Sequence, residues 1–249
     1  MFKPQQTIKH RKHKKGNDLL HNEFGLISWN IHKKGKVEAF QNHLFHLQEK
    51  YPADILTFQE AEEPHPNELT SEHFETLYTP NLQTKNKSYG LVTASIIPHY
   101  NALCLLSAHQ ELFFKTHKST LISCYQTEHA SDLIIVNIHA LNFRRAKTYE
   151  IEIETLISVL KQYSGPLIIA GDFNAWTKPR NAILEKMQRT LSLSKVTFQN
   201  AHHIKQFRTY PLDCVFYRNL NVIQAEALDT GKLSDHNPLY ARFSFISNS

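Results

Sequence analysis

The sequence contains little cysteine and no long apolar segment. Its 249 residues include 3 cysteines, Cys104, Cys124 and Cys214, which lie in apolar runs and form no Cys-x-x-Cys pair. This usage indicates buried thiols in a reducing compartment and argues against a disulfide framework. No run approaches the ~18 consecutive apolar residues of a membrane-spanning helix, and Met1 to Asn22 lacks the apolar core of a secretory signal. We therefore expect a cytoplasmic protein without a transmembrane segment.

Linkers rich in glycine or proline are also absent, and the chain contains no internal repeat. The first 15 residues carry six basic side chains, and these supply much of the excess positive charge that gives the net charge of +5. Without them the chain is nearly neutral, so its basicity gives little support for a nucleic-acid partner. We predict that residues 1–22 form a disordered basic tail, with a weak tether to nucleic acid or anionic lipid as the alternative. Residues 23–249 are expected to form one domain, as a monomer.

Hydrophobic periodicity predicts many strands with a few helices between them. Apolar residues recur at helical spacing over 36–50 and 146–163, and residues 180–191 form a third predicted helix. Strands are predicted at 24–29, 54–58, 88–96, 102–107, 112–114, 119–126, 133–138, 167–170, 213–217, 222–228 and 239–245. Residues 62–67 are predicted to form a loop. This order indicates an α/β fold in which two sheets pack together between flanking helices.

Polar or titratable side chains follow several of the apolar strands directly. Such positions lie on one rim of a sheet, where the packed core beneath holds them rigidly. Each signal alone is poor, because an acidic residue after a strand is usually on the surface and Gly-Asp-Phe-Asn also suits an Asx turn. The ordered set is more specific. It comprises Asn30, Glu60, His139, Asp172, Asn174, Asp213, Asp235 and His236.

The stretches that carry this set are Ser28–His32, Phe58–Glu60, Asn137–His139, Gly171–Asn174, Leu212–Phe216 and Ser234–Pro238. Together they resemble the endonuclease/exonuclease/phosphatase superfamily over about residues 24–245. The resemblance implies a four-layered α/β sandwich of the deoxyribonuclease I type, with two mixed sheets between helices. It also implies a phosphoesterase that depends on Mg²⁺ or Mn²⁺. His32 and His139 favour the deoxyribonuclease and sphingomyelinase side of the superfamily over the apurinic-site endonucleases.

Candidate roles follow from the chemistry of these side chains and agree with the resemblance. Glu60 is the expected chief metal ligand, and Asn30 and Asp235 are expected to complete or orient its coordination sphere. Asp172 is expected to orient or deprotonate the attacking water, and Asn174 to hold the phosphate. The remaining candidates are acid, base or orienting groups. These are His139, Asp213 and His236.

Other candidates have ordinary structural alternatives. Arg144 is expected either to clamp a phosphate or to be a solvated charge before a helix. Tyr89 is either near the mouth of the site or packed at its rim, and Trp176 either stacks on a base or covers the core. His32 is interpreted as a loop residue beside the metal site. The chain has 16 histidines, which suggests zinc, but those away from the ordered set have no nearby cysteine and no His-Glu-x-x-His frame. Surface positions are the preferred interpretation for His10, His13, His43, His46, His202 and His203.

We therefore predict a metal-dependent phosphodiesterase that acts on DNA or RNA. The alternative is a phosphoesterase acting on a phospholipid or a small phosphorylated metabolite, although the sequence shows no hydrophobic membrane anchor. A non-catalytic binding module on the same fold is the third possibility, and it would require a degraded site, whereas every required position here carries a suitable residue.

Overall fold

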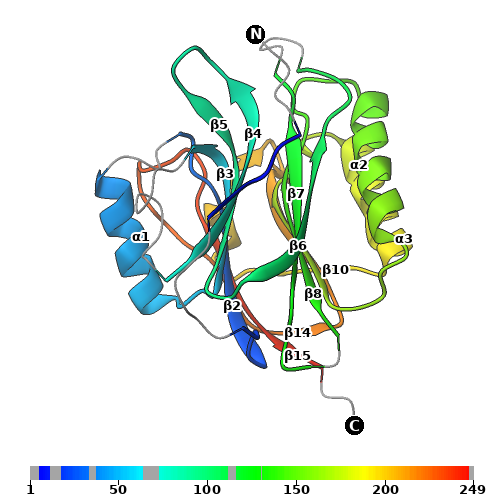
Figure 1. Cartoon of the computed structure of the whole chain (residues 1–249). Coiled ribbons are helices and arrows are strands. Elements are labelled where there is room, and N and C mark those ends of the chain that lie inside the picture. Colours follow the sequence, from blue (N-terminus) through cyan, green and yellow to red (C-terminus); the bar gives the residue numbers. More distant parts are fainter. Residues whose placement is uncertain are drawn as a thin grey trace.

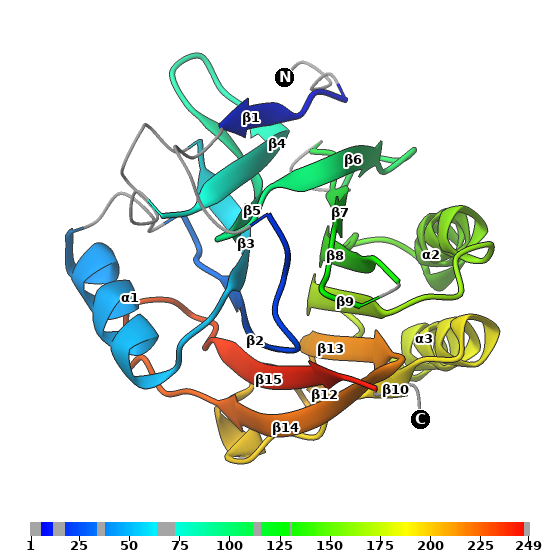
Figure 2. The same cartoon turned by 60° about the horizontal axis from the view of Figure 1, so that its bottom comes forward.

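The computed structural model describes residues 6–11, 18–33, 38–63, 73–111, 116–129 and 131–246. Two β-sheets pack face to face in its centre (Figure 1). Helix α1 (Glu38–Lys50) covers the outer face of one sheet, while α2 (Ala146–Leu160) and α3 (Lys178–Leu191) cover the other (Figure 2). This arrangement confirms the predicted four-layered α/β sandwich.

The first sheet is mixed and contains seven strands among the described residues. Its strand order is β1-β4-β5-β3-β2-β15-β14. All neighbours pair antiparallel except β2 and β3, which are parallel and joined through α1. The strands are β1 (Lys9–Arg11), β2 (Glu23–Asn30), β3 (Ile55–Glu62), β4 (Glu75–Gln83), β5 (Ser88–Ser95), β14 (Leu220–Ala227) and β15 (Leu239–Phe245).

The second sheet has the order β10-β13-β9-β8-β7-β6 within the described part of the chain. It contains a matching parallel pair, β8 and β9, joined through α2. Its strands are β6 (His99–Leu106), β7 (Ser119–Tyr125), β8 (Leu133–His139), β9 (Leu167–Asp172), β10 (Ser194–Lys195) and β13 (Asp213–Arg218). A short hairpin of β11 (Gln206–Phe207) and β12 (Tyr210–Pro211) and the 3-10 helix η1 (Ala201–His203) lie in the connection between β10 and β13.

Alternating side chains of the central strands supply both the inner core and the two helix-facing cores. On β9, Ile168 and Ala170 pack between the sheets, while Leu167 and Ile169 face α2 and α3. This alternation follows from the two-residue period of a strand. Strands buried on both faces read as continuous apolar runs, which is why they were predictable from the sequence.

Not every element follows the prediction. Strand β4 was not predicted, and it contains Pro80. β1 pairs only with Thr76 to Tyr78, so the outer edge of β4 at Pro80 requires no backbone donor there. The prediction of a disordered tail is wrong for Lys9–Arg11, which form β1. The predicted strand 112–114 and most of the predicted loop 62–67 lie outside the described residues.

No helix in the described part of the chain has the length and apolar character needed to cross a membrane.

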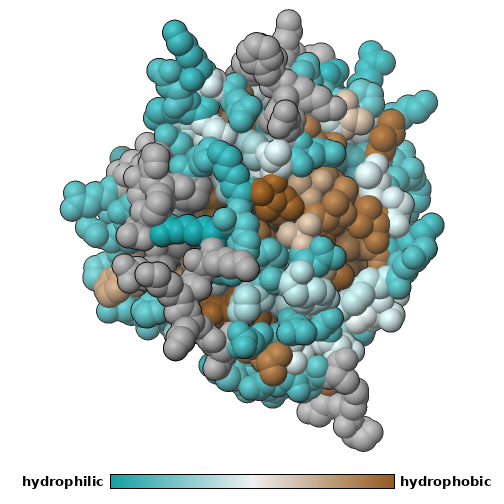
Figure 3. Space-filling view, in the orientation of Figure 1, coloured by the Kyte–Doolittle hydropathy of each residue, from teal (hydrophilic) through white to brown (hydrophobic). Residues whose placement is uncertain are grey.

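Helices α2 and α3 pack mainly on β8 and β9, and apolar side chains are exposed between β6 and α2 (Figure 3). Leu103 on β6 and Ile151 on α2 are among them. The extent of a single domain over residues 23–249 stays a prediction.

Candidate active site

Three neighbouring strands of the second sheet place polar side chains in a row. Ile168 and Ala170 of β9 face the other sheet, and Asp172 follows with the same parity, so it also points between the sheets. His139 ends β8 directly opposite Asp172, and Asp213 begins β13 opposite Asp172 on the other side. The register of the sheet therefore sets these three groups side by side at the point where the apolar core ends.

The first sheet contributes residues that meet this row from the opposite layer. Asn30 ends β2, and its Nδ2 donates a hydrogen bond of 3.1 Å to Oδ2 of Asp172. His236 lies in the loop before β15, where its Nδ1 is 2.7 Å from Oδ2 of Asp213 and its Nε2 is 3.9 Å from Oδ2 of Asp172. Asp172 thus lies at the centre of a cluster built from both sheets.

A third part of the cluster surrounds His139. Its Nε2 lies 3.6 Å from Oδ2 of Asp172 and 3.9 Å from Oε1 of Glu60. The same nitrogen lies 2.7 Å from Nζ of Lys118, which is 8% exposed. Glu111 is a further carboxylate 3.7 Å from that ammonium group. A buried lysine therefore supplies positive charge among several acidic groups.

Backbone conformations that side chains rarely adopt gather at this site. His32, Glu60 and Asn174 have φ values of 43°, 53° and 48°. Gly171 has a φ of 142°, and a Cβ there would lie 2.0 Å from the carbonyl oxygen of Ile138. Such conformations are uncommon for residues with side chains and often occur at functional sites. At Glu60 the conformation coincides with a register shift between β3 and β5.

Burial and neighbouring charges change the protonation of the cluster. Burial and the adjacent Asp213 carboxylate raise the pKa of Asp172 to about 6. Burial opposes ionisation of His236, but its hydrogen bond and charge interaction with Asp213 raise its pKa to about 9. Burial and the Lys118 ammonium hold the pKa of His139 well below its ordinary value. The two histidines therefore differ: His236 is protonated at neutral pH and His139 is neutral.

The carboxylates fit a divalent cation by their chemistry. Oε2 of Glu60 and Oδ1 of Asp235 lie 3.7 and 3.4 Å from the same nitrogen, Nδ1 of His32. Both carboxylates therefore lie near one ring nitrogen, and the backbone N–H of the same residue, His32, donates to Oδ1 of Asn30 at 3.1 Å. Hard oxygen donors of this kind are the ones Mg²⁺ prefers. Lys205 is hydrogen-bonded to Asp235 and partly neutralises it.

The tightest convergence of donor atoms is elsewhere in the cluster. The ligand atoms of Asp172, Asp213 and His236 lie within 4.8 Å of one another. This group was expected to act as acid, base and orienting partner rather than to hold a metal. The residues expected to hold the metal are Asn30, Glu60 and Asp235. Glu60 and Asp235 each lie near Nδ1 of His32, whereas Asn30 donates to Asp172.

The remaining predicted residues lie around the cluster with varied contacts. The backbone N–H of Asn174 donates to Asp172 at 3.0 Å, and its Nδ2 donates to the carbonyl oxygen of Ala140 at 3.1 Å. Nε of Arg144 donates to the carbonyl oxygen of Gln110, so this guanidinium is at least partly used to hold a loop. Tyr89 is half-buried on β5.

Arg180 was predicted only as part of a helix, but it ties two loops of the site together. Its Nη1 donates to the carbonyl oxygens of Leu141 and Asn174, each at 2.7 Å. Its guanidinium also lies 4.6 Å from the ring centre of Tyr149 and 5.1 Å from that of Trp176. Trp176 therefore packs on this buried charge and covers the core edge.

Lys118 was also missed by sequence reasoning, which considered mainly the C-terminal ends of strands. It precedes β7, and β7 runs antiparallel to β8. The start of β7 therefore lies at the same rim as the end of β8, where His139 stands. Recognition of that pairing from the two apolar runs would have placed Lys118 beside His139.

Comparisons with known proteins agree with this architecture. Residues 27–236 match the model of the endonuclease/exonuclease/phosphatase family. A UPF0294 protein of Klebsiella pneumoniae is 35% identical over 225 residues, which cover 88% of this chain and 81% of that protein.

Two solved structures share the fold at low sequence identity. The catalytic domain of human Nocturnin with a bound sulfate anion has a TM-score of 0.66 at 16% identity, covering 98% of this chain and 100% of that one. ANGEL2, described as a 2′,3′-cyclic phosphatase, has a TM-score of 0.65 at 17% identity, covering 89% of this chain and 95% of that one. The chain is a member of the endonuclease/exonuclease/phosphatase family of phosphoesterases.

Proposed function

We propose that the protein is a divalent-metal-dependent phosphodiesterase that hydrolyses nucleic acid, DNA or RNA. The observation that carries this proposal is the position of Asp172. Asn30, His139 and His236 reach it from three different strands or loops. A carboxylate surrounded by two histidines and an amide, beside further acidic groups, suits the attack of water on phosphorus.

The expected metal is Mg²⁺ or Mn²⁺, held by Glu60 with Asn30 and Asp235. When bound, such an ion acts as a Lewis acid on the phosphoryl oxygens. The four carboxylates at 60, 172, 213 and 235 would repel one another without positive charge, which supports a cation at this position.

The protein's own groups supply the proton transfers. Asp172 has a pKa of about 6, close enough to neutrality for it to accept a proton from the attacking water. His236 is protonated and fixed by Asp213, so it is suited to contact the phosphate and stabilise negative charge. His139 is neutral and buried beside Lys118, and we assign this pair to the phosphate or to the leaving oxygen.

A nucleic-acid substrate is supported by positive charge near the cluster. Lys118 and Lys205 both contact residues of the candidate site. Sulfate bound to the catalytic domain of Nocturnin is a tetrahedral anion like phosphate, which agrees with an anion-binding site on this fold.

The proposal is tested with the purified protein on single- and double-stranded DNA, RNA, bis-(p-nitrophenyl) phosphate and phospholipid vesicles. We expect hydrolysis of nucleic acid with Mg²⁺ or Mn²⁺ and none with EDTA. Asp172→Asn should lower kcat by about 10²- to 10⁴-fold, the usual contribution of a general base. Asp132→Asn is the matched control, because Asp132 lies just before the first residue of β8, whereas His139 is the last residue of that strand.

Two results would contradict the proposal in different ways. Turnover that persists in EDTA or in Asp172→Asn would remove the proposed mechanism. Cleavage of vesicles or of a small phosphoester, with nucleic acids left intact, would keep the mechanism and replace the substrate.

A further inference from the structure

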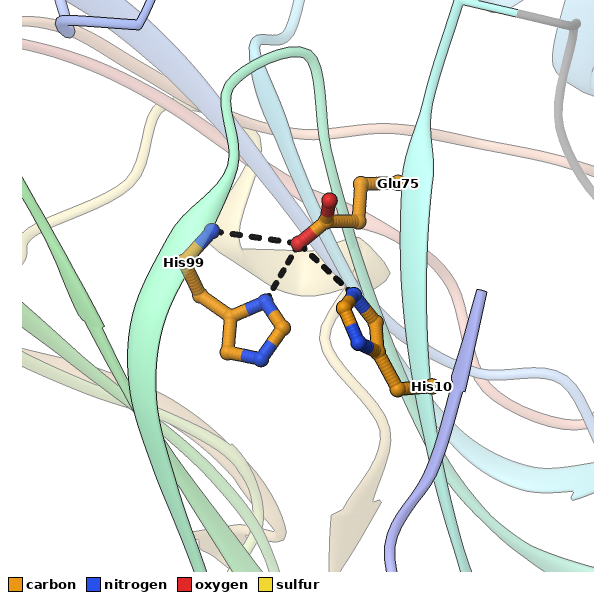
Figure 4. Close-up of side chains that lie close together, drawn as sticks. All are labelled: His10, Glu75 and His99. Carbon is orange, nitrogen blue, oxygen red and sulfur yellow. Dashed lines mark hydrogen bonds and ion pairs between the residues drawn. The ribbon is translucent and has the colours of Figure 1, made fainter. Parts of the chain in front are cut away.

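A second group of side chains with potential metal-ligand atoms lies at the other end of the sandwich. It comprises His10 on β1, Glu75 at the start of β4 and His99 at the start of β6 (Figure 4). Glu75 is paired with Ser95 of β5, and Ser95 is also paired with Ile55, the first residue of β3. Glu60 lies five residues after Ile55 on β3, which corresponds to about 16 Å along the strand at roughly 3.3 Å per residue. The group is therefore separate from the candidate active site.

The donor atoms of this group converge on one carboxylate oxygen. Nε2 of His10 lies 3.0 Å from Oε1 of Glu75, and Nδ1 of His99 is hydrogen-bonded to the same oxygen. The backbone N–H of His99 also donates to it at 3.1 Å. Figure 4 shows both rings turned toward this oxygen, and their centroids are 4.4 Å apart.

The arrangement exceeds what hydrogen bonding of one carboxylate requires. The side chain of Glu75 is 7% exposed, and His99 alone already supplies two donors to it. His10 brings a second imidazole from another strand to the same oxygen, with its side chain 30% exposed. The buried Glu75 carboxylate and His99 form the rigid inner part of the group, while His10 lies on its solvent side.

We propose that His10, Glu75 and His99 bind a zinc(II) ion. Two neutral imidazoles and one carboxylate, with a position left for water, are a recurrent zinc-binding set. Tetrahedral ligands at about 2.0–2.1 Å from zinc are separated by roughly 3.4 Å, so small side-chain movements convert the present contacts into coordination. Imidazole donors favour zinc over Mg²⁺, which distinguishes this site from the proposed catalytic metal site.

A zinc ion bound to this group would link strand β1 to both sheets. β1 has only three residues, all exposed, and pairs with the edge of the seven-stranded sheet. Glu75 belongs to that sheet, whereas His99 belongs to the other. An ion held by all three side chains joins β1, β4 and β6, and its binding free energy stabilises the folded arrangement.

The test uses full-length protein stripped with EDTA, dialysed into millimolar Mg²⁺ and titrated with ZnCl₂ in a calorimeter. We expect the wild type to bind one equivalent of zinc more than His10→Ala or His99→Ala. Zinc should also slow trypsin cleavage after Lys9 in the wild type and not in these variants. His46→Ala is the matched control, because His46 lies beside a single carboxylate, Glu49, on α1. It should retain the full zinc stoichiometry.

A spectroscopic measurement on the wild type avoids dependence on the folding of the His10 and His99 variants. The ring ¹⁵N resonances of His10 and His99 should shift with one equivalent of zinc, in the wild type and in Asp172→Asn alike. Equal zinc stoichiometry in the wild type and in both histidine variants would overturn the proposal. So would zinc-induced shifts confined to His139 and His236, because the ion would then bind only at the candidate active site.

Discussion

Replacement of Arg180 tests whether a single buried guanidinium holds the loops of the candidate site. Arg180 is 1% exposed, and its donors reach the carbonyl oxygens of Leu141, Asn142, Arg144 and Asn174. The first three of these carbonyls lie in the loop after His139, and the fourth lies in the loop after Asp172. Arg180→Met keeps an unbranched apolar stem and removes the guanidinium with every donor.

The cost can be estimated from these contacts. The bonds to Leu141 and Asn174 are fully buried, and each carbonyl left without a donor costs about 1–2 kcal/mol. The two bonds from Nη2 are partly buried, so water can replace them at little cost. Loss of the stacks on Tyr149 and Trp176 adds about 0.5–1 kcal/mol each. We expect a total loss of about 3–6 kcal/mol in the free energy of unfolding.

Urea unfolding followed by circular dichroism measures this loss, with kcat and KM on a nucleic-acid substrate measured in parallel. Arg180→Lys should recover only part of the stability, because an ammonium cannot reproduce the planar fork of donors. Arg189→Met on the exposed side of the same helix should change stability by about 0.5 kcal/mol at most. If Arg180→Met unfolds within about 1 kcal/mol of the wild type at an unchanged m-value, the loops are held by other contacts.

Three further predictions concern the surroundings of the site. Lys118→Met should lower kcat by about 10²-fold, through loss of positive charge beside His139, while urea unfolding shows lower stability because the buried Glu111 carboxylate loses its charged partner; an unchanged kcat would exclude Lys118 from the reaction. Gly171→Ala should destabilise the fold by about 3 kcal/mol or more in thermal unfolding, because the new Cβ meets the backbone at Ile138; a Tm equal to that of the wild type would contradict this. Burial raises the pKa of Glu152 from 4.5 to about 7, so its contribution to stability is fully present below pH 4.5 and is lost as the pH rises through 7, by about 3 kcal/mol. Glu152→Gln should therefore flatten the dependence of unfolding free energy on pH over this window, and a parallel curve would refute the assignment.

The apolar runs and their order determined most of the secondary structure. The runs that form β2, β8 and β9 are buried on both faces, so their continuous apolar character identifies them as strands. Strand β4 was not predicted because Pro80 and several polar residues interrupt the apolar pattern expected of a strand. Pro80 is tolerated at that edge because β1 is short and does not pair with it. The three-residue strand β1 has no pattern of its own and depends on β4 for its pairing.

The sequence by itself determined which side chains are candidates for the site, because strand parity and motif order place Asn30, His139 and Asp172 at the end of an apolar core. Only the tertiary structure decided how they meet. The distances among Asp172, Asp213 and His236 depend on two sheets packed face to face, and no local pattern encodes that packing. For the same reason the group around Glu75 emerged only in three dimensions, since its members belong to strands that the chain brings together across long sequence separations.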